Sequence, residues 1–477
     1  MKYPTEVQND LLLDLVKTAK NTEWGKQHDY QSIKNYSDFK NNVPLQDYES
    51  LKPNILRVKK GEQNILWPTE IKWFAKSSGT VTGKSKFIPV SKESLVGCHY
   101  KGGKDLLSIY HHNHPESKLI LGKVLVVGGS SQINHLNSGS YTGDLSAIIM
   151  KNFPFWVEQR RVPNIKVALM AEWEEKIEKM AISTIKEDVS NISGVPSWTL
   201  ILLQKIMEIT KANNIAEVWP NLEMYMHGGV NFLPYKQQFN ELIGSTNMNY
   251  YENYNASEGF FGLQDQSKVE EMLLMLDYGI FYEFIPLHEN NSDTVLLEDV
   301  ELNKNYEVVI STNAGLWRYR IGDTIKFTSL NPFRIQVTGR TKLFVNAFGE
   351  ELIIENAEMA LAVACKKTNA SIRDYTVAPV YLNNNKSGKH QWLIEFEQHP
   401  ERLDYFVELL DNGLKNLNSD YEAKRYKNLI LDFPEVISLP DNTFYRWMKL
   451  NNKLGGQHKV PRLSNNRDIV DEILKMV

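Results

Sequence analysis

The chain has 477 residues, of which 42% are hydrophobic and 23% charged, so it can form a large core and does not have the composition of a disordered protein. Its formal net charge of −4 argues against a dedicated nucleic-acid-binding protein, which normally carries a strong basic excess. The two cysteines, Cys98 and Cys365, cannot form a disulfide framework or a four-thiolate zinc site, so a reducing compartment is the simpler interpretation.

Neither the N-terminal segment nor the most apolar stretch has the pattern of a membrane or secretion signal. Asp10 and Asp14 interrupt the apolar positions before Gly25, unlike the core of a signal peptide. The stretch Leu119–Gly129 is far too short to cross a bilayer and contains Lys123, so we expect a buried strand that runs into a glycine turn. These features predict a soluble, cytoplasmic protein without a membrane partner.

In the first half of the chain, predicted helices alternate with predicted strands. Apolar residues recur at helical spacing near the N-terminus, and Ser197 is placed to cap a later helix. Helices are expected over residues 5–20, 172–186 and 197–212, and strands over 123–127 and 222–226. This alternation favours an α/β architecture with buried sheets.

The second half begins with a β-rich run and ends with a smaller mixed unit. Strands are expected over residues 307–310, 323–327, 335–337, 375–382 and 392–397, and helices over 355–367 and 400–417, followed by a helix–loop–helix. A boundary is most plausible near Gly339–Lys342. We therefore expect a large domain of residues 1–340 and a small α+β C-terminal domain of residues 341–477, within the usual range of domain sizes.

The segment Ser77–Lys86, with the sequence SSGTVTGKSK, has the composition of an anion-binding loop. Its glycines let the backbone approach an anion, its hydroxyl and N–H groups can donate hydrogen bonds to phosphate oxygens, and its lysines add charge. It is not a P-loop, because Gly79 and Gly83 enclose three residues where that motif has four. Taken alone, it is either a phosphate site or an ordinary surface loop.

Two further segments place a carboxylate beside small residues. In Tyr254–Gly259 (YNASEG), Glu258 could hold Mg²⁺ next to a phosphate, although a solvated turn is the simpler interpretation of this segment alone. In Gly315–Asp323 (GLWRYRIGD), Asp323 is expected at the end of a strand, where a carboxylate can accept hydrogen bonds from ribose hydroxyls. A hairpin with surface arginines is the alternative for the second segment.

Two basic segments and one histidine cluster complete the candidates. The sequence GRTK (339–342) falls at the expected domain boundary, and Lys459 lies in HKVPR (458–462) after a glycine pair. A single lysine in a polar loop is most simply a solvated charge. The histidines at 111, 112 and 114 have no acidic or thiol partner at ligand spacing, so we interpret them as a polar turn rather than a metal site.

In this order, the five segments resemble those of the adenylate-forming superfamily, which includes acyl-CoA synthetases and luciferase. The details are more similar to its acyl-acid amido synthetases, the Gretchen Hagen, auxin-responsive family. The segments that carry this likeness are SSGT with a following lysine and Ile88-Pro89, LWRYRIGD (316–323), HKVPR (458–462), ISGVPSW (192–198) and GSYTG (139–143). The likeness covers nearly the whole chain. Asn255 and His458 depart from it, since plant members have a small residue and usually a tyrosine there.

The resemblance implies an α/β fold with a large N-terminal adenylate-forming domain of packed sheets and helices, and a small mobile α+β C-terminal domain. It implies a two-step reaction with ATP and Mg²⁺. A carboxylic acid first attacks the α-phosphate of ATP, giving an acyl-adenylate and pyrophosphate, and the amine of an amino acid then displaces AMP. Adenylation supplies a stable leaving group, which agrees with the lack of a convincing catalytic triad in the sequence.

The resemblance also implies a role for individual residues. The phosphates would be cradled by Ser77, Ser78, Gly79, Thr80, Gly83 and Lys86. The adenine and the nucleotide next to it would be contacted by Gly228, Gly229, Tyr254, Asn255, Ala256 and Ser257. Glu258 would hold Mg²⁺, and Asp323 would bind the ribose hydroxyls. Arg340 would support nucleotide contacts beside the hinge residue Lys342, and Lys459 would stabilise charge on the α-phosphate.

Two alternatives to amide formation remain open at this point. The acyl group could pass to a thiol, as in an acyl-CoA ligase, or the chain could be a nucleotide-binding regulator without turnover. The presence of Glu258, Asp323 and Lys459 together argues against the regulator. The sequence names neither the acid nor the amine.

Overall fold

The computed structural model describes most of the chain, which divides into two compact units. The described residues are 2–77, 86–128, 133–136, 139–170, 172–229, 232, 235–266, 269–287, 293–340, 344–345, 352–380, 388–418, 421–422, 425, 431–454, 459–464 and 466–477. The N-terminal unit comprises residues 1–229 and 245–337, and the C-terminal unit comprises residues 230–244 and 338–477.

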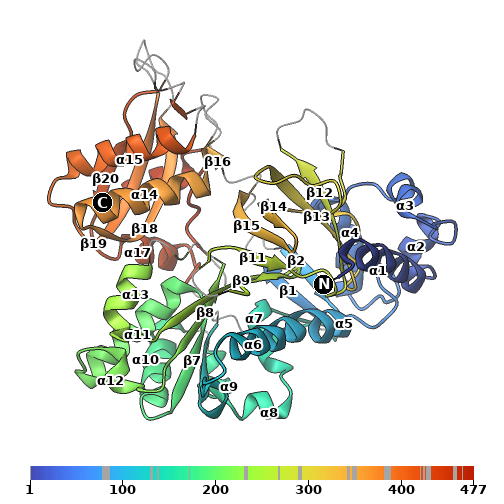
Figure 1. The fold of residues 1–477 in the computed structure, drawn as a ribbon, viewed down its shortest axis with the longest axis horizontal. Helices are drawn as coiled ribbons and strands as arrows, with labels where there is room; N and C mark the ends of the chain where they lie inside the picture. Colours follow the sequence, from blue (N-terminus) through green and yellow to red (C-terminus); the bar gives the residue numbers. More distant parts are fainter. Residues whose placement is uncertain are drawn as a thin grey trace. The chain divides into compact units, whose positions relative to one another are not determined.

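A mixed sheet of eleven strands, counted over the described residues, forms the centre of the N-terminal unit (Figure 1). Its strands are β3 (Lys123–Val127), β6 (Arg161–Val162), β7 (Val189–Gly194), β8 (Met224–Gly228), β9 (Asn249–Ala256), β10 (Gly259–Leu263), β11 (Met272–Leu274), β12 (Ile280–Pro286), β13 (Asn305–Thr312), β14 (Tyr319–Leu330) and β15 (Phe333–Arg340). Their order is β12-β13-β14-β15-β11-β10-β9-β8-β7-β3-β6. Strands β6, β3, β7, β8 and β9 pair in parallel, whereas β10 pairs antiparallel with β9 and β11.

A smaller sheet holds Ser77 and Lys86, the two ends of the predicted anion-binding segment SSGTVTGKSK. It contains β1 (Trp73–Ser77), β2 (Lys86–Val90), β4 (Asn134–His135) and β5 (Tyr141–Gly143), in the order β2-β1-β5-β4. Strands β1 and β2 are antiparallel and pair Ser77 with Lys86, so residues 78–85 connect two neighbouring strands. Strand β5 pairs in parallel with β1.

Helices pack around these sheets. They are α1 (Pro4–Ala19), α2 (Glu23–Gln27), α3 (Tyr36–Asn42), α4 (Tyr48–Lys59), α5 (Lys92–Ser94), the π-helix η1 (Leu95–Tyr100), α6 (Lys101–Asn113), the 3₁₀-helix η2 (Leu119–Leu121), α7 (Leu145–Lys151), α8 (Phe155–Glu158), α9 (Ile165–Ala168), α10 (Trp173–Thr184), α11 (Pro196–Thr210) and α12 (Ile215–Val218). Helices α10 and α11 lie side by side next to β7 and β8 (Figure 1).

A buried glutamine fixes the first helix to the sheet. The side-chain amide of Gln8 donates to the carbonyl oxygens of Leu276 (2.7 Å) and Ile280 (3.0 Å), and its oxygen accepts from the Tyr282 N–H at 2.9 Å. The polar atoms of this side chain are therefore satisfied inside the core, where an unpaired amide would be costly. Around it, apolar side chains of α1 and α4 share one core with β9 to β15.

Over its described residues, the C-terminal unit contains a three-stranded sheet with helices on both faces and a separate two-stranded sheet. Its elements are α13 (Lys236–Ile243), β16 (Phe344–Val345), β17 (Leu352–Ile353), α14 (Ile354–Thr368), β18 (Ser371–Val380), β19 (Lys389–Gln398), α15 (Leu403–Leu417), β20 (Glu435–Leu439), α17 (Thr443–Leu450) and α18 (Asp468–Leu474). Because side chains alternate along a strand, Trp392 and Ile394 of β19 pack with α14 and α15, whereas Leu393 packs with α17 and α18.

The structure confirms the expected α/β fold with a large N-terminal and a smaller C-terminal part. The division of the chain into separate domains after residue 340 stays a prediction. The assignment of residues 230–244 to the C-terminal unit was not expected, since they precede the expected boundary after residue 340.

Four local expectations were wrong. Helix α11 begins at Pro196 with Val195 at the N-cap position, so position 197 lies inside the helix and not at its cap. The stretch from Leu119 begins with a 3₁₀-helix whose Ile120 is 61% exposed, and the strand starts only at residue 123. The histidines at 111 and 112 belong to helix α6 rather than to a loop. Asp323 lies inside β14 and not at its end.

Within the described part of the chain, no helix combines the length and the apolar character needed to cross a bilayer.

Candidate active site

The YNASEG segment forms the end of β9, a two-residue turn and the start of β10. Ala256 pairs with Gly259, so Ser257 and Glu258 are the two turn residues. Strand β9 also runs parallel to β8, with Gly228 in register with Asn253. Gly228 and the YNASEG turn therefore lie side by side at the carboxyl ends of the parallel strands β8 and β9. This is the edge at which open α/β sheets bind ligands.

Close packing at this edge requires a glycine at position 228. A Cβ atom added to Gly228 would collide with the backbone carbonyl oxygen of Asn253. The Asn253 side-chain amide also donates to the His227 carbonyl oxygen at 3.0 Å. These contacts hold the two strand ends together, and Gly229 continues the chain with a positive φ of 78°.

One buried hydrogen bond joins the second and third sequence segments. The Tyr254 hydroxyl donates to Asp323 Oδ2 at 2.6 Å, and the two residues are 9% and 6% exposed. A bond from a hydroxyl to a carboxylate is stronger than one between neutral groups. Asp323 follows Gly322, whose φ is +83°, in an irregular stretch of the β13–β14 pairing. Such an irregularity redirects a side chain relative to a regular strand.

The hydroxyl of Tyr319 is influenced by the charges of both Asp323 and Glu258. Its side chain is fully buried, and burial raises the pKa of its hydroxyl far above the ordinary value, with further contributions from the negative charges of Glu258 and Asp323. The two carboxylates thus act on the same hydroxyl. Within the described residues, neither the Tyr319 hydroxyl nor the buried Ser257 Oγ forms a hydrogen bond. Buried hydroxyls without protein partners suit a polar ligand, because leaving them unpaired is costly.

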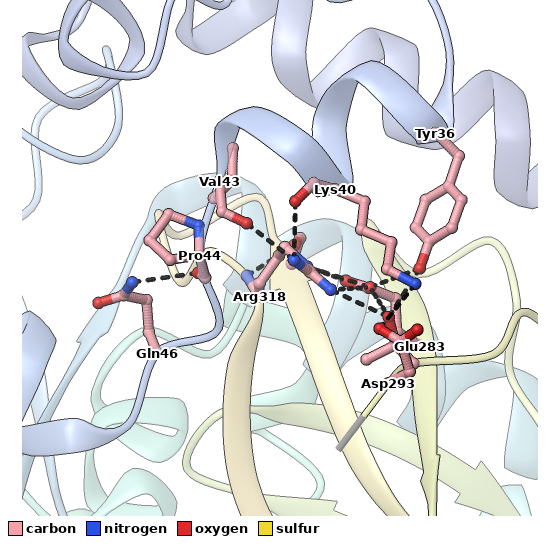
Figure 2. Close-up of polar contacts among 10 residues, drawn as sticks. Tyr36, Lys40, Val43, Pro44, Gln46, Glu283, Asp293 and Arg318 are labelled. Atoms are coloured by element: carbon pink, nitrogen blue, oxygen red, sulfur yellow. Dashed lines mark hydrogen bonds and ion pairs between the residues drawn. The ribbon is translucent and has the colours of Figure 1, made fainter. Parts of the chain in front are cut away.

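A buried ion pair holds the start of β14 in place (Figure 2). The Arg318 guanidinium donates to both carboxylate oxygens of Glu283 at 2.8–3.1 Å, and the two side chains are 5% and 1% exposed. It also donates to the carbonyl oxygens of Lys40 at 3.2 Å and Val43 at 2.8 Å. The Tyr36 hydroxyl donates to the same carboxylate at 2.8 Å. Arg318 adopts a φ of +42°, a conformation that these contacts hold in place.

The segment before α4 pairs with the same strand. The Gln46 N–H donates to the Arg318 carbonyl oxygen at 2.9 Å, and the Arg320 N–H donates to the Gln46 carbonyl oxygen at 2.8 Å. Residues on both sides of Tyr319 are thereby bound to the N-terminal part of the chain. This arrangement fixes the strand that carries Tyr319 and Asp323.

The π-helix η1 braces the YNASEG turn from another direction. His99 Nδ1 lies 2.9 Å from the Asn255 side-chain oxygen, and burial lowers the pKa of His99 to about 4. Cys98 Sγ accepts the Phe260 N–H at 3.1 Å. Sequence reasoning missed both residues. The departure of Asn255 from the family pattern was the available signal, since an unusual polar side chain needs a partner when it is buried. π-Helical segments are frequent at functional sites.

The phosphate-loop residues Ser78, Gly79, Thr80 and Gly83 lie outside the described residues, as does the hinge residue Lys342. The flanking Lys86 is half-buried, with its Nζ 5.7 Å from the centre of the Tyr48 ring. Lys59 Nζ lies 3.1 Å from the centre of the Phe87 ring. Burial and the charge of Lys76 lower the pKa of Lys59. Positive side chains therefore accompany both strands that lead into the loop.

Lys459 belongs to the C-terminal unit and is exposed. Its loop is attached to β18, because the Val377 N–H donates to the Arg462 carbonyl oxygen at 2.9 Å and the Ser464 N–H donates to the Val377 carbonyl oxygen at 3.0 Å. Arg340 is the last residue of strand β15. The roles of Lys459 and Arg340 toward a nucleotide stay predictions.

Glu258 is the carboxylate that the sequence analysis assigned to Mg²⁺. In the part of the chain that the structure describes, no group of three or more histidine, cysteine and acidic side chains is arranged to hold a metal ion. Mg²⁺ at phosphate sites commonly takes one or two carboxylates together with phosphate oxygens and water. A half-buried Glu258 at the tip of a turn fits that requirement.

Comparison with known proteins gives consistent relatives. The chain is 25% identical over 405 residues to the indole-3-acetic acid-amido synthetase GH3.4 of Arabidopsis thaliana, covering 69% of this chain and 66% of that protein, slightly under two thirds. It is 25% identical over 547 residues to the 4-substituted benzoates-glutamate ligase GH3.12 of the same plant, covering 96% and 92%.

Solved structures show the same fold. The GH3.15 acyl acid amido synthetase in complex with 2,4-DB matches with a TM-score of 0.83 and 16% identity, over 99% of this chain and 94% of that one. A 2-hydroxyisobutyryl-CoA ligase in its postadenylation state, in complex with 2-HIB-AMP, matches with a TM-score of 0.57 and 12% identity, over 98% and 91%.

Three family descriptions match successive parts of the chain. The GH3 family N-terminal domain matches residues 1–248, the central domain residues 273–340 and the C-terminal domain residues 355–468. The first match alone covers more than half of the chain, and the order of the three agrees with the resemblance seen in the sequence. The chain belongs to the GH3 family.

Proposed function

We propose that this chain uses ATP to activate a carboxylic acid as an acyl-adenylate and transfers the acyl group to the amine of an amino acid, releasing AMP and pyrophosphate. The named relatives of the family are ligases that join an acid to an amino acid, which supports this reaction class. The observation that carries the proposal is the buried bond from Tyr254 to Asp323, which joins two of the sequence segments expected to bind one nucleotide.

In this proposal, the carboxyl ends of β8 and β9 form the adenine and ribose side of the site. Gly228 lets β8 approach β9 closely, Gly228 and Gly229 would line the adenine, and Tyr254 holds Asp323 where it can accept hydrogen bonds from ribose hydroxyls. The hydroxyls of Ser257 and Tyr319 are further donors at this edge. These hydroxyls form no hydrogen bond among the described residues, so they would pair with groups of the bound nucleotide.

The remaining assigned residues act on the phosphates. Glu258 would hold Mg²⁺, which supplies charge neutralisation between the phosphate oxygens when it is bound. The SSGT segment and Lys86 would surround the β- and γ-phosphates. Lys459 would stabilise the charge that develops on the α-phosphate while the acid attacks and pyrophosphate leaves. Arg340 would support the nucleotide next to the hinge at Lys342.

Pyrophosphate exchange tests the proposal directly. The purified chain is incubated with ATP, Mg²⁺, labelled pyrophosphate and each member of a set of aryl, indolyl and short aliphatic acids. Exchange that depends on one class of acid, followed by amide formation when amino acids are added, is the expected result. Product formation with coenzyme A instead of an amino acid would move the assignment to an acyl-CoA ligase. The absence of exchange with every acid would reject catalysis.

Two substitutions check the assigned roles within that assay. Lys459→Ala and Glu258→Ala are each expected to lower the exchange rate by about 10²–10³, because each removes an electrostatic contact to the reacting phosphates. Glu258→Ala should also raise the Mg²⁺ concentration that is needed. Lys367→Ala and Glu298→Ala, two exposed positions, serve as matched controls. Exchange at the wild-type rate in the Lys459 variant would refute its role.

A further inference from the structure

Arg462 lies three residues after Lys459, in the segment of residues 459–464 that we call the Lys459 loop. Its side chain contacts strand β18 and Tyr235. Its guanidinium pairs with the Asp374 carboxylate of β18, and its Nη2 donates to the Tyr235 hydroxyl at 3.0 Å. The centre of the guanidinium lies 4.6 Å from the centre of the Tyr375 ring. Arginine suits this place because its planar fork can serve two acceptors and stack on a ring at the same time.

The tyrosine that accepts from Arg462 belongs to a distant part of the sequence. Tyr235 directly precedes helix α13 and is 4% exposed. Phe239 and Ile243 of this helix are 0% and 1% exposed, and the Phe239 ring packs at 5.3 Å from the Phe232 ring. Helix α13 is therefore well buried, and it belongs to the C-terminal unit although it lies more than 200 residues before Arg462 along the chain.

The chain passes between the two units at three places, after residues 229, 244 and 337. A glycine with positive φ stands at or near each of them: Gly229 at +78°, Gly244 at +68° and Gly339 at +147°. Glycine adopts such angles without steric cost and can absorb a large change in backbone angle. The passages are therefore suited to act as hinges.

We propose that Arg462 is a positioning residue that fastens the Lys459 loop and helix α13 into one body, so that a displacement of Lys459 is transmitted to the chain at Gly228-Gly229. This proposal rests on the proposed function, which places Gly228-Gly229 and Lys459 in one reaction. Because bond lengths along the chain are fixed, a rotation of a body that begins just after Gly229 changes the backbone angles at Gly228-Gly229. The position of the small unit and the shape of the adenine side of the site would then change together.

A double-mutant cycle tests the fastening in the full chain. Tyr235→Phe removes only the hydroxyl, and Arg462→Lys keeps the charge but loses the fork that reaches both Asp374 and Tyr235. Tyr405→Phe, a 42% exposed tyrosine of α15, is the matched control. Amide hydrogen exchange is read for residues 236–244, which report on α13, and for Val377 and Ser464, whose N–H groups report on the docking of the Lys459 loop.

Tyr235→Phe is expected to speed exchange roughly tenfold in both regions at once, the size of one lost hydrogen bond to a charged group. The double variant should exchange no faster than the stronger single variant, because both changes remove the same contact. In pyrophosphate exchange, kcat should fall while KM for the acid stays unchanged, which separates positioning from lost substrate binding. Tyr405→Phe should behave as the wild type in each assay.

Faster exchange in one region without the other, additive effects of the two substitutions, or an unchanged kcat would each overturn the proposal. Tyr235→Phe keeps the ring that fills the core, so the cycle stays informative even where Arg462→Lys folds poorly. A wild-type chain that shows no pyrophosphate exchange would reject the proposed function. The hydrogen-exchange comparison would still decide separately whether Arg462 fastens helix and loop.

Discussion

At the scale of single residues, burial decides the protonation state of His99. The side chain is 5% exposed and contacts Asn255 through Nδ1, and burial lowers its pKa from 6.5 to about 4. A neutral imidazole with its Nδ1–H directed at an amide oxygen leaves Nε2 as an acceptor. The brace on the YNASEG turn therefore depends on His99 remaining uncharged.

This pKa predicts a loss of stability in acid. Between pH 6.5 and 4 the unfolded chain binds a proton at His99 that the folded chain does not, so the contribution of His99 is intact above pH 6.5 and is lost as pH falls toward 4. The loss is about 3 kcal/mol in the free energy of unfolding. Urea unfolding at pH 7 and pH 4.5 measures it. His99→Gln should lose less between these pH values than the exposed control His112→Gln, and equal losses would contradict the assignment.

The Arg318–Glu283 pair predicts a second effect at this scale. Glu283→Gln should lower the free energy of unfolding by about 3–5 kcal/mol, because it leaves the buried guanidinium without a compensating charge. The control is Asp293→Asn at the nearby Lys40–Asp293 pair, where Asp293 has a 66% exposed side chain and the expected loss is below about 1 kcal/mol. Denaturant unfolding compares them, and similar losses in both variants would show that burial of the pair is unimportant.

At the scale of elements, the site depends on how closely β8 and β9 approach each other. Their parallel pairing brings Gly228 against the Asn253 backbone, and the β9–β10 turn then presents Ser257 and Glu258. Each strand alone carries only part of the candidate site. The pairing register sets which of these residues meet, because a shift by one residue would turn every side chain to the other face.

Gly228→Ala tests this close approach. The added methyl group must push β8 from β9, so a loss of about 1–3 kcal/mol in unfolding free energy is expected, together with weaker ATP binding. Gly103→Ala in helix α6 is the matched control, since an added Cβ there meets no atom within 4 Å. That control should be neutral or stabilising by up to about 1 kcal/mol. Thermal unfolding and ATP titration measure both variants, and a Gly228 variant with normal stability and affinity would exclude tight strand contact.

At the scale of the whole molecule, the division into two units raises the question of their motion. The proposed reaction needs Lys459 for adenylation and then has to admit an amino acid. A hinge rotation of the small unit between these steps would satisfy both needs. The glycines near each passage between the units are compatible with such a rotation.

A non-hydrolysable acyl-adenylate mimic provides the test. Small-angle X-ray scattering of the full chain with and without the mimic should give different scattering curves, because the occupied site favours one arrangement of the units. The comparison is repeated with Asp323→Ala, which is expected to bind the mimic poorly and keep the unliganded curve. Identical curves for the wild-type chain, at mimic concentrations shown to saturate it, would reject the rotation.

Much of the fold could be predicted from the sequence because helices and strands leave local patterns. The helix over 5–20 and the strand over 123–127 are found as α1 (Pro4–Ala19) and β3 (Lys123–Val127). The family and the mixed α/β fold are confirmed as well. Errors occurred where local signals compete, as at Leu119–Leu121, where an apolar run proved to be a 3₁₀-helix with exposed side chains.

The candidate site could be predicted only as a set of separate segments. The order of those segments pointed to the family, and the structure brings Tyr254 to Asp323. It also adds His99, and it shows surroundings of Arg318 and Tyr319 that the LWRYRIGD segment alone does not reveal. For Arg318 and His99 the significance comes from partners that are distant along the chain, such as Glu283, 35 residues from Arg318, and Asn255, 156 residues from His99.

By itself the sequence determined the class of fold, the family and the types of residue available for nucleotide chemistry, because composition, periodicity and motif order are properties of neighbouring residues. Only the tertiary structure decided that Tyr254 bonds Asp323, that His99 stays neutral beside Asn255, and that helix α13 joins the unit that carries Lys459. The physical reason is that alternation along a strand or helix specifies which face is buried, whereas the partner that covers this face is chosen by the packing of the whole chain.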